Sequence, residues 1–378
     1  MSTEKHSFRV GLDARPLSTR VSGVGRLISE ILKYFPDKIN YEFILFSHLP
    51  IHESHQELLN LPNVSVQKGE GFFSKKGGLY FLFELPRQIR KMNLDVFWGS
   101  QQVAPLFIPK KLPIVLTYCD LVLYLYPDTM RKIAALQQKF FQGSSVRRAD
   151  FILSISENTR QDLIKKFNFP EAKTGISYPG ADPARIRSFL KTPSSDKLAL
   201  LPQKFMLSVS TIEPRKNYPY LLEVFRKYRK LAEKPIPWVI VGKKGWETEQ
   251  FYADLEHDRK TYNDIIIIDN ADDADLHHIY SRAELFLFAS VYEGFGIPLL
   301  EALIHGRKCI ASDIPTFREI GGSSIPYCSL ENSDEWVREI LNQLKSDRVP
   351  EIDLEKFSSE NSALATWEVF QKVLGLGK

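Results

Sequence analysis

The sequence predicts an α/β protein of two domains in which strands alternate with helices. The chain has 378 residues, a length that suits two domains of ordinary size, each with its own core. Its contents of hydrophobic and charged residues, 43% and 25%, are those of a globular protein. Short apolar runs typical of buried strands recur along the chain, and several are followed by apolar residues at helical spacing.

Residues 284–312 contain a complete strand, loop, helix and strand. Leu285–Ala289 is a short apolar run typical of a buried strand, and apolar residues at helical spacing follow Pro298. Pro298 suits the first helical position and Gly306 the residue just past the helix end. Because Lys308–Ser312 can return as the next strand, the stretch predicts one βαβ unit.

The loop of this unit has the features of a phosphate site. Gly294 and Gly296 allow the backbone to approach a ligand closely, and the helix behind them presents amides with partial positive charge. Glu293 and Glu301 frame the loop, with Glu301 expected in the first helical turn. Since carboxylates only accept hydrogen bonds, beside a phosphate they suit sugar hydroxyls. In the alternative interpretation Glu301 is a helix-favouring residue and Glu293 a solvated loop charge.

The same residues carry a family resemblance. The string VYEGFGIPLLEALIHG, residues 291–306, resembles the E-x7-E signature of the retaining glycosyltransferases of family 4. The chain resembles in particular their mannosyltransferase-like members of bacterial polysaccharide and O-antigen synthesis. The resemblance implies the GT-B fold, with two facing Rossmann-like domains, parallel sheets and a C-terminal helix that crosses back to the first domain.

The resemblance also implies roles for single residues. The first glutamate of the family signature contacts the donor sugar and the second binds the ribose of the nucleotide, roles that fall to Glu293 and Glu301. Donor binding extends along the motif to Gly294, Phe295, Gly296, Pro298 and Leu299.

The domain boundaries follow from composition and the resemblance. We expect an acceptor-side domain at residues 1–190, a domain that binds the nucleotide sugar at 200–355, and the crossover helix at 356–378. The polar segment 192–197 suits an exposed linker. Ser358–Leu374 has apolar residues at helical spacing, which predicts an amphipathic helix.

The first strand, Phe8–Asp13, leads to two glycines at a helix entrance, Gly23 and Gly25. A dinucleotide-binding fingerprint is disfavoured because the tight turn is missing and Ile28 stands where a third glycine belongs. The segment resembles the family's first loop, in which glycines approach the donor diphosphate. The alternative is a pair of glycines in a mobile surface loop.

Another candidate residue follows the expected strand Ile114–Thr117. Family members commonly have a His-Asp pair there, whereas this chain has Cys119 and Asp120. Asp120 can orient an acceptor hydroxyl, or it can cap the strand end.

The second domain opens with the strand Phe205–Val209, and Arg215 and Lys216 lie in the loop after it. Ligands of α/β sheets bind at such strand ends. The two cations can neutralise a diphosphate, the arginine through a forked contact and the lysine as a point charge. The string EPRKN around them also matches the family.

A metal ion is not expected. Asp273-Ala274-Asp275 imitates a metal-binding D-x-D motif, but Asp275 is placed as a helix-capping acid would be. His277 and His278 suit the surface of that helix. We therefore predict no cofactor and no metal, with a nucleotide-diphosphate sugar as the donor substrate.

The chain is expected to be cytoplasmic. Its cysteines, Cys119, Cys309 and Cys328, are widely spaced and suit reduced thiols. The N-terminus lacks the apolar region of a signal peptide, and no run approaches the ~18 apolar residues of a membrane span. A net charge of only +4 does not require nucleic acid as a partner.

Residues 68–92 combine basic and aromatic residues. Six basic side chains stand against two acidic ones, an excess equal to that of the whole chain, with five aromatic residues among them. This composition suits peripheral contact with an anionic membrane, and equally a helix with an aromatic core face.

The resemblance and the candidate residues together predict a retaining hexosyltransferase. Our best assignment is transfer of mannose from GDP-mannose to a glycan or polyprenyl-linked acceptor in cell-surface polysaccharide (lipopolysaccharide) synthesis. One alternative is a catalytically degenerate partner protein that binds nucleotide sugar or membrane without turnover. Another is a Rossmann oxidoreductase.

Overall fold

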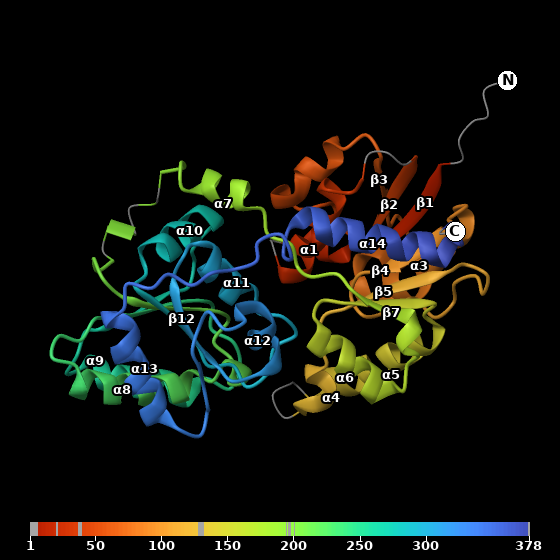
Figure 1. The fold of residues 1–378 in the computed structure, drawn as a ribbon. Coiled ribbons are helices and arrows are strands. Elements are labelled where there is room, and N and C mark those ends of the chain that lie inside the picture. The colour runs from red at the N-terminus through yellow and green to blue at the C-terminus, as the bar shows by residue number, and fades with distance from the viewer. Residues whose placement is uncertain are drawn as a thin grey trace. The chain divides into compact units, whose positions relative to one another are not determined.

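A computed structural model describes residues 7–19, 22–36, 40–127, 132–193, 195, 198–199 and 201–376, without the side chains of residues 132–137. The chain forms two compact units (Figure 1). Unit 1 comprises the residues up to Gly180 together with those from Glu355 onward, and unit 2 comprises Ala181–Leu354. The expected linker at 192–197 lies partly outside the described residues.

Unit 1 ends its first segment at Gly180, ten residues before the end expected at residue 190, and unit 2 begins at Ala181. The reason is α7 (Pro183–Phe189), which packs against α10 (Asp273–Arg282). The rings of Phe189 and His277 stack with centroids 4.9 Å apart. This contact places α7 in unit 2.

Within its described residues, unit 1 has one sheet of seven strands, all paired in parallel. The strand order is β3-β2-β1-β4-β5-β6-β7, which reverses direction between β1 and β4 as in a Rossmann fold. The strands are β1 Phe8–Asp13, β2 Tyr41–Ser47, β3 Val64–Lys68, β4 Val96–Gly99, β5 Ile114–Tyr118, β6 Phe151–Ser154 and β7 Thr174–Ile176.

The sequence analysis did not assign β2, β3 or β7. β3 carries no apolar run, because it lies at the sheet edge and most of its residues are exposed or half-buried. β7 has only three residues, too few for a periodic pattern.

The helices of unit 1 include the one at the end of the chain. They are α1 Gly23–Lys33, α2 Gly77–Leu79, the π-helical turn η4 Tyr80–Glu84, α3 Leu85–Lys91, α4 Val122–Leu125, α5 Lys132–Arg148, α6 Glu157–Phe167 and α14 Ser359–Leu374. α14 packs against α1, β6 and β7 (Figure 1). Its Trp367 and Phe370 lie 5.7 Å from Phe35 and 5.8 Å from Trp98, measured between ring centroids. The predicted return of the C-terminal helix to the first domain is therefore confirmed.

Unit 2 has a second all-parallel sheet, in which the described strands have the order β10-β9-β8-β11-β12-β13. They are β8 Met206–Val209, β9 Trp238–Val241, β10 Ile265–Ile268, β11 Leu285–Phe288, β12 Lys308–Ser312 and β13 Tyr327–Cys328. Besides α7 and α10, its helices are α8 Tyr218–Leu231, α9 Glu249–Arg259, α11 Ile297–Ile304, α12 Pro315–Gly321 and α13 Ser333–Lys345. Two Rossmann-like parallel sheets agree with the predicted fold.

α11 ends where the sequence places its end. Gly306 has φ +66°, the N–H of Gly306 donates to Leu303 O at 2.8 Å, and that of Arg307 donates to Ala302 O at 2.9 Å. These two bonds form a Schellman cap. The helix begins at Ile297, so Pro298 is its second residue and Glu301 its fifth. The expectation that Glu301 lies in the first turn was therefore wrong.

Two expectations about α10 were also wrong. The N-cap is Asp272, whose side chain accepts from the N–H of Asp275, while Asp275 itself accepts from the N–H and hydroxyl of Ser195. His277 is buried and its Nδ1 lies 3.0 Å from His305 Nε2, so it is no surface residue. Within the described residues, no helix is both long and apolar enough to cross a membrane.

Candidate active site

Two loops of unit 2 bring the predicted charged residues together. β8 and β11 are neighbours in the sheet, so the loops after their carboxyl ends lie side by side. The β8 loop contains the 3-10 turn η8 (Pro214–Lys216), and the β11 loop carries Glu293. The N–H of Val291 donates to Arg215 O at 2.9 Å, which ties the two loops directly.

Glu293 is buried and accepts three hydrogen bonds from side chains. Arg215 Nη1 donates at 2.6 Å, Ser290 Oγ at 2.7 Å, and Lys216 Nζ donates to the same carboxylate oxygen as the serine. Burial opposes ionisation of Glu293, but Arg215 and Lys216, with the hydrogen bonds, outweigh it and lower its pKa to about 2. Glu293 is therefore a carboxylate at neutral pH.

Arg215 is held on several sides. Its guanidinium also donates to Tyr292 O at 2.9 Å and to Glu213 at 2.8 Å. These bonds use the N–H donors of the planar guanidinium, whose geometry is fixed. Arg215 and Lys216 thus form ion pairs with Glu293. We expected the two cations to bind a diphosphate and Glu293 to bind the donor sugar.

Lys216 retains donors for a ligand. Its ammonium has three N–H donors, and Glu293 is the one hydrogen-bond acceptor recorded for it among the described residues. Burial lowers the pKa of Lys216, with Glu293 opposing and Arg215 reinforcing that effect. A phosphate oxygen at Nζ would stabilise the buried ammonium as Glu293 does.

The loop from Gly294 to Leu299 provides fewer amides than its length suggests. Pro298 has no N–H, and the N–H of Leu299 donates to Gly296 O at 2.9 Å. Gly296 has φ +122°, and a Cβ there would lie 2.9 Å from the Phe317 ring. Phe295 is buried behind the loop. The glycine at 296 is therefore required by both conformation and space.

Glu301 is buried on α11, eight residues after Glu293. Ser290 and Thr316 support the loop before it, since Ser290 Oγ bonds Glu293 and Thr316 Oγ1 donates to Glu293 O at 2.9 Å. The sequence analysis did not identify either residue. Ser290 stands three residues before Glu293 at the strand end, which is a usable signal, whereas nothing in the sequence marks Thr316.

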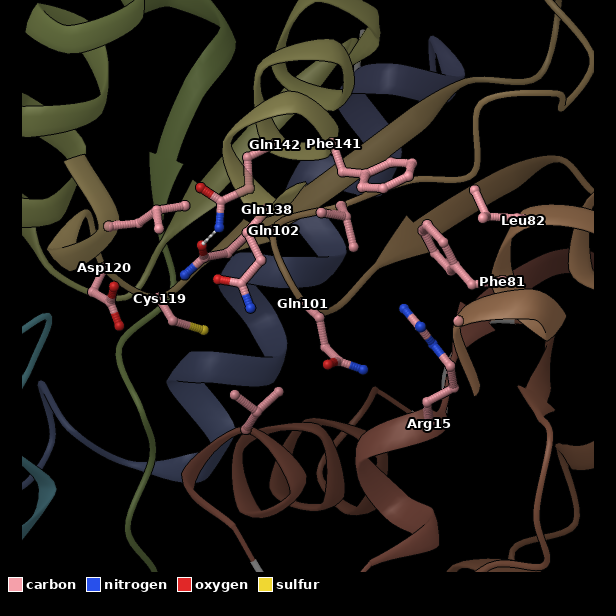
Figure 2. Close-up of a pocket in the computed structure, with 14 residues that line it drawn as sticks. Arg15, Phe81, Leu82, Gln101, Gln102, Cys119, Asp120, Gln138, Phe141 and Gln142 are labelled. Carbon is pink, nitrogen blue, oxygen red and sulfur yellow. Dashed lines mark hydrogen bonds between the residues drawn. The ribbon is translucent and has the colours of Figure 1, made fainter. Parts of the chain in front are cut away.

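Unit 1 contains a cavity of about 550 Å³ (Figure 2). Arg15 and Gln101 extend into it in the figure, and Phe81 and Phe141 form apolar parts of its wall. The remaining lining residues are Val24, Gly78, Leu82, Gln102, Val103, Cys119, Asp120, Leu123, Gln138 and Gln142. Four glutamines thus meet in one place. Gln101 and Gln102 follow a strand end, where the sequence predicts cleft residues, whereas Gln138 and Gln142 were not predicted.

Asp120 lies in the cavity wall and forms a local turn with the first residue of α4. Its Oδ1 accepts from the N–H of Val122 at 3.1 Å, at the start of α4. Burial raises the pKa of the neighbouring Cys119 thiol to about 12, and the Asp120 charge adds to the rise. Cys119 is therefore a neutral thiol at pH 7, unable to serve as a base.

The predicted glycines of unit 1 lie in the first turn of α1. Gly23 is exposed at its first position, and the N–H of Gly25 donates to the N-cap Ser22 Oγ at 3.1 Å. A Cβ on Gly25 would lie 3.2 Å from His55 Nε2. Val24, between the glycines, lines the cavity. The described residues hold no group of three or more His, Cys, Asp or Glu side chains placed to bind a metal ion.

Similarity to solved structures agrees with this architecture. The structure is similar to that of HepE from Anabaena, solved in complex with UDP and glucose, with a TM-score of 0.65. The two chains are 15% identical, and the match covers 98% of this chain and 99% of HepE. The protein has the GT-B fold of glycosyltransferases.

The family follows from sequence. Residues 21–185 match the family model described as Glycosyltransferase Family 4, and residues 192–360 match that of Glycosyl transferases group 1. The two models together cover most of the chain. The chain therefore belongs to the glycosyltransferases in which a family 4 domain is followed by a group 1 domain, and it is an enzyme of that class.

Two relatives have more specific names. O-antigen chain mannosyltransferase B of Escherichia coli is 26% identical over 280 residues, which are 70% of this chain and 72% of that protein. O-antigen chain mannosyltransferase RfbU of Salmonella typhimurium is 25% identical over 230 residues, 60% of either chain.

Proposed function

We propose that the chain is a retaining mannosyltransferase that uses GDP-mannose and acts in the synthesis of a cell-surface polysaccharide such as O-antigen. The names of two relatives support mannose as the sugar. The observation that carries the proposal is the buried cluster in which Arg215 and Lys216 meet Glu293 at neighbouring strand ends.

In this proposal the donor binds to unit 2. Lys216 and Arg215 contact the diphosphate, whose negative charge grows as the bond from the sugar C1 to the diphosphate oxygen breaks. Glu293 holds both cations and accepts from hydroxyls of the sugar, and Glu301 accepts from the ribose. The fixed positive charge stabilises the leaving group in the transition state, and we expect no metal ion to be required.

The acceptor hydroxyl attacks C1 on the face that the diphosphate leaves, so the anomeric configuration is retained. Its proton passes to an oxygen of the departing diphosphate. No protein base is then needed, which suits a chain with Cys119 in place of the family histidine.

The unit 1 cavity suits the acceptor. Its glutamine amides donate and accept hydrogen bonds, as sugar hydroxyls do, and aromatic rings pack on the apolar faces of a sugar. In this proposal Asp120, which lines the cavity, orients the reacting hydroxyl. A lipid-linked acceptor would also agree with the proposed membrane contact through residues 68–92.

The first test is a thermal-shift panel of GDP-, UDP- and ADP-sugars, followed by transfer assays with mass spectrometric detection. GDP-mannose is expected to raise Tm most and to give a product with the donor's anomeric configuration by NMR. Activity should persist in EDTA. Inversion at C1, loss of activity in EDTA, or preference for another sugar nucleotide contradicts the corresponding part of the proposal, and nucleotide-sugar binding without turnover favours the degenerate partner.

A further inference from the structure

One helical segment of unit 1 has an inner and an outer face. The 3-10 turn η3 (Phe72–Lys75) is followed by continuous helical structure from Gly77 to Lys91. Phe81 and Leu82 line the cavity, and the Phe81 ring centroid lies 4.0 Å from the Arg15 guanidinium carbon. The next residue, Phe83, is 51% exposed to solvent. Consecutive residues of this segment therefore form the cavity wall and the outer surface.

Three phenylalanines form an exposed aromatic patch, which we define as Phe72, Phe73 and Phe83. Phe72 is 78% and Phe73 41% exposed. Their ring centroids lie 5.8 Å apart, and those of Phe73 and Phe83 lie 5.2 Å apart. The rings contact one another at the surface, where exposure of apolar area to water is unfavourable. A contiguous apolar patch of this kind marks a binding surface.

Exposed cations adjoin the aromatic patch. Lys75 and Lys76 follow two of its residues in sequence, and Arg87, Arg90 and Lys91 lie four, seven and eight residues after Phe83, on one helical face. For these five side chains no ion pair with a carboxylate is recorded in the described part of the chain. Arg90 Nη2 does donate to the backbone oxygen of Phe107, at 2.6 Å. Aromatic rings that can enter a lipid interface, beside cations that can meet acidic head groups, fit an anionic bilayer.

The helix between cavity and patch contains a π-helical turn. The N–H of Leu85 donates to Tyr80 O, five residues earlier. Tyr80 and Leu85 are both fully buried, while Phe83 between them faces outward. π-Helical turns occur frequently at functional sites. Here the turn fixes the boundary between the aromatic patch and the cavity wall.

The cavity itself carries little net charge. Arg15 donates to both carboxylate oxygens of the buried Asp13, at 2.8 and 2.7 Å, so the cation is already neutralised. The other polar groups facing the cavity are Asp120, Cys119 and the four glutamines. Amides recognise hydroxyls, and among the described side chains that line the cavity Arg15 is the one cation, already paired with Asp13.

We propose that unit 1 docks on an anionic lipid bilayer through the aromatic patch and its adjacent cations, and that its acceptor is an amphiphile, with an uncharged glycan in the cavity and a lipid anchor in that bilayer. The acceptor part rests on the proposed function. The docking part rests on the exposed side chains alone. The two parts are therefore tested separately.

Docking is tested by co-sedimentation of the full chain with vesicles of phosphatidylcholine, with and without phosphatidylglycerol. The protein should sediment with the anionic vesicles. The double variant Phe72→Ser/Phe83→Ser should have an affinity for them at least roughly tenfold lower. Lys75→Glu/Arg87→Glu should lose at least about fivefold per removed cation. Leu231→Ser, a matched change at a 68% exposed residue of unit 2, should bind like the wild type.

A wild-type protein that stays in the supernatant, or an aromatic-patch variant that sediments equally well, overturns the docking surface. Thermal unfolding of each variant checks that the exposed substitutions leave the fold intact.

The acceptor part is tested by measuring KM for the same glycan as a free oligosaccharide and on a lipid carrier in anionic vesicles. Phe72→Ser/Phe83→Ser should raise KM about tenfold for the lipid-linked acceptor, with kcat and the KM for the free glycan unchanged. The acceptor part is overturned if KM changes equally for both acceptors or changes for neither. A preference of the enzyme for a glycan that ends in an acidic sugar also overturns it. If neither acceptor reacts with any donor, the proposed function fails, while sedimentation still decides the docking surface.

Discussion

The two polar sites of the molecule differ in charge. In unit 2, Arg215, Lys216, Glu213 and Glu293 are packed together with little solvent exposure. In unit 1, the cavity is lined by amides, apolar side chains, the Cys119 thiol and the Asp120 carboxylate, and Arg15 there is already paired with Asp13. A ligand that gains charge during reaction needs fixed cations, whereas a ligand with hydroxyls needs neutral donors and acceptors. The difference supports our proposal that the diphosphate binds in unit 2 and the glycan in unit 1.

The strongest test of this difference removes a cation from unit 2. Lys216→Ala should cut turnover by at least about tenfold, because a charged hydrogen bond to the leaving group is lost. The free energy of unfolding should also fall by about 3 kcal/mol, since one partner of a buried ion pair disappears. Steady-state kinetics and urea unfolding measure the two effects.

Lys204→Ala is the matched control, because this lysine of unit 2 is exposed and its nearest carboxylate is 3.9 Å away. It should leave both quantities within about 0.5 kcal/mol of the wild type. A Lys216→Ala enzyme with full turnover would show that the cluster only holds the two loops together.

The acid stability of unit 2 should depend on Glu293. Its pKa is lowered from 4.5 to about 2, so the ionised cluster stabilises the fold above about pH 4.5, and this contribution is lost as the pH falls towards 2. The shift corresponds to a contribution on the order of 3 kcal/mol. Urea unfolding between pH 5 and about pH 2 should therefore be less steep in pH for Glu293→Gln.

Glu293→Gln should also lower turnover by about tenfold or more, since the amide cannot hold two cations. An unchanged pH slope would mean that the carboxylate is not the group that titrates.

A smaller effect is expected from Gly296→Ala in the loop before α11. The backbone there has φ +122°, and the added Cβ would lie 2.9 Å from the Phe317 ring, so we expect a loss of about 2–3 kcal/mol in the free energy of unfolding. The control Gly375→Ala lies in the left-handed region, with φ +70° and ψ 24°, and has no atom within 4 Å of the new Cβ, so it should cost only about 1 kcal/mol. Similar losses for both variants would show that the Phe317 contact is unimportant.

The unit 2 cluster was more accessible to prediction from sequence than the unit 1 cavity. Arg215, Lys216 and Glu293 each directly follow an apolar strand, and parallel strands carry their loops to one edge of the sheet. Their meeting could thus be expected from local patterns. That the cations would lie on Glu293 itself could not, because side-chain pairing depends on the register of β8 and β11.

The cavity of unit 1 had this signal only in part, at the segments that follow β4 and β5. Gln101 and Gln102 follow β4, whereas Gln138 and Gln142 lie on α5, and glutamine at a helix surface is ordinary. Gln102 adopts φ +65°, a conformation that its residue type does not announce. Its side-chain amide lies 2.6 Å from Gln142 Nε2, a contact between segments forty residues apart. Such a site depends on tertiary packing.

The smallest predicted effect concerns Asp120, for which the sequence left two roles open. Its Oδ1 accepts from the N–H of Val122, the first residue of α4, and asparagine keeps an oxygen in that position while alanine does not. If Asp120 only makes this bond, Asp120→Asn should leave KM for the acceptor unchanged and Asp120→Ala should cost about 1 kcal/mol of stability. If its charge also orients the acceptor hydroxyl, both variants should raise the acceptor KM about fivefold, with an unchanged Kd for the donor. Kinetics with varied acceptor, beside nucleotide-sugar binding by calorimetry, separates the two roles, and a change in donor affinity alone would contradict both.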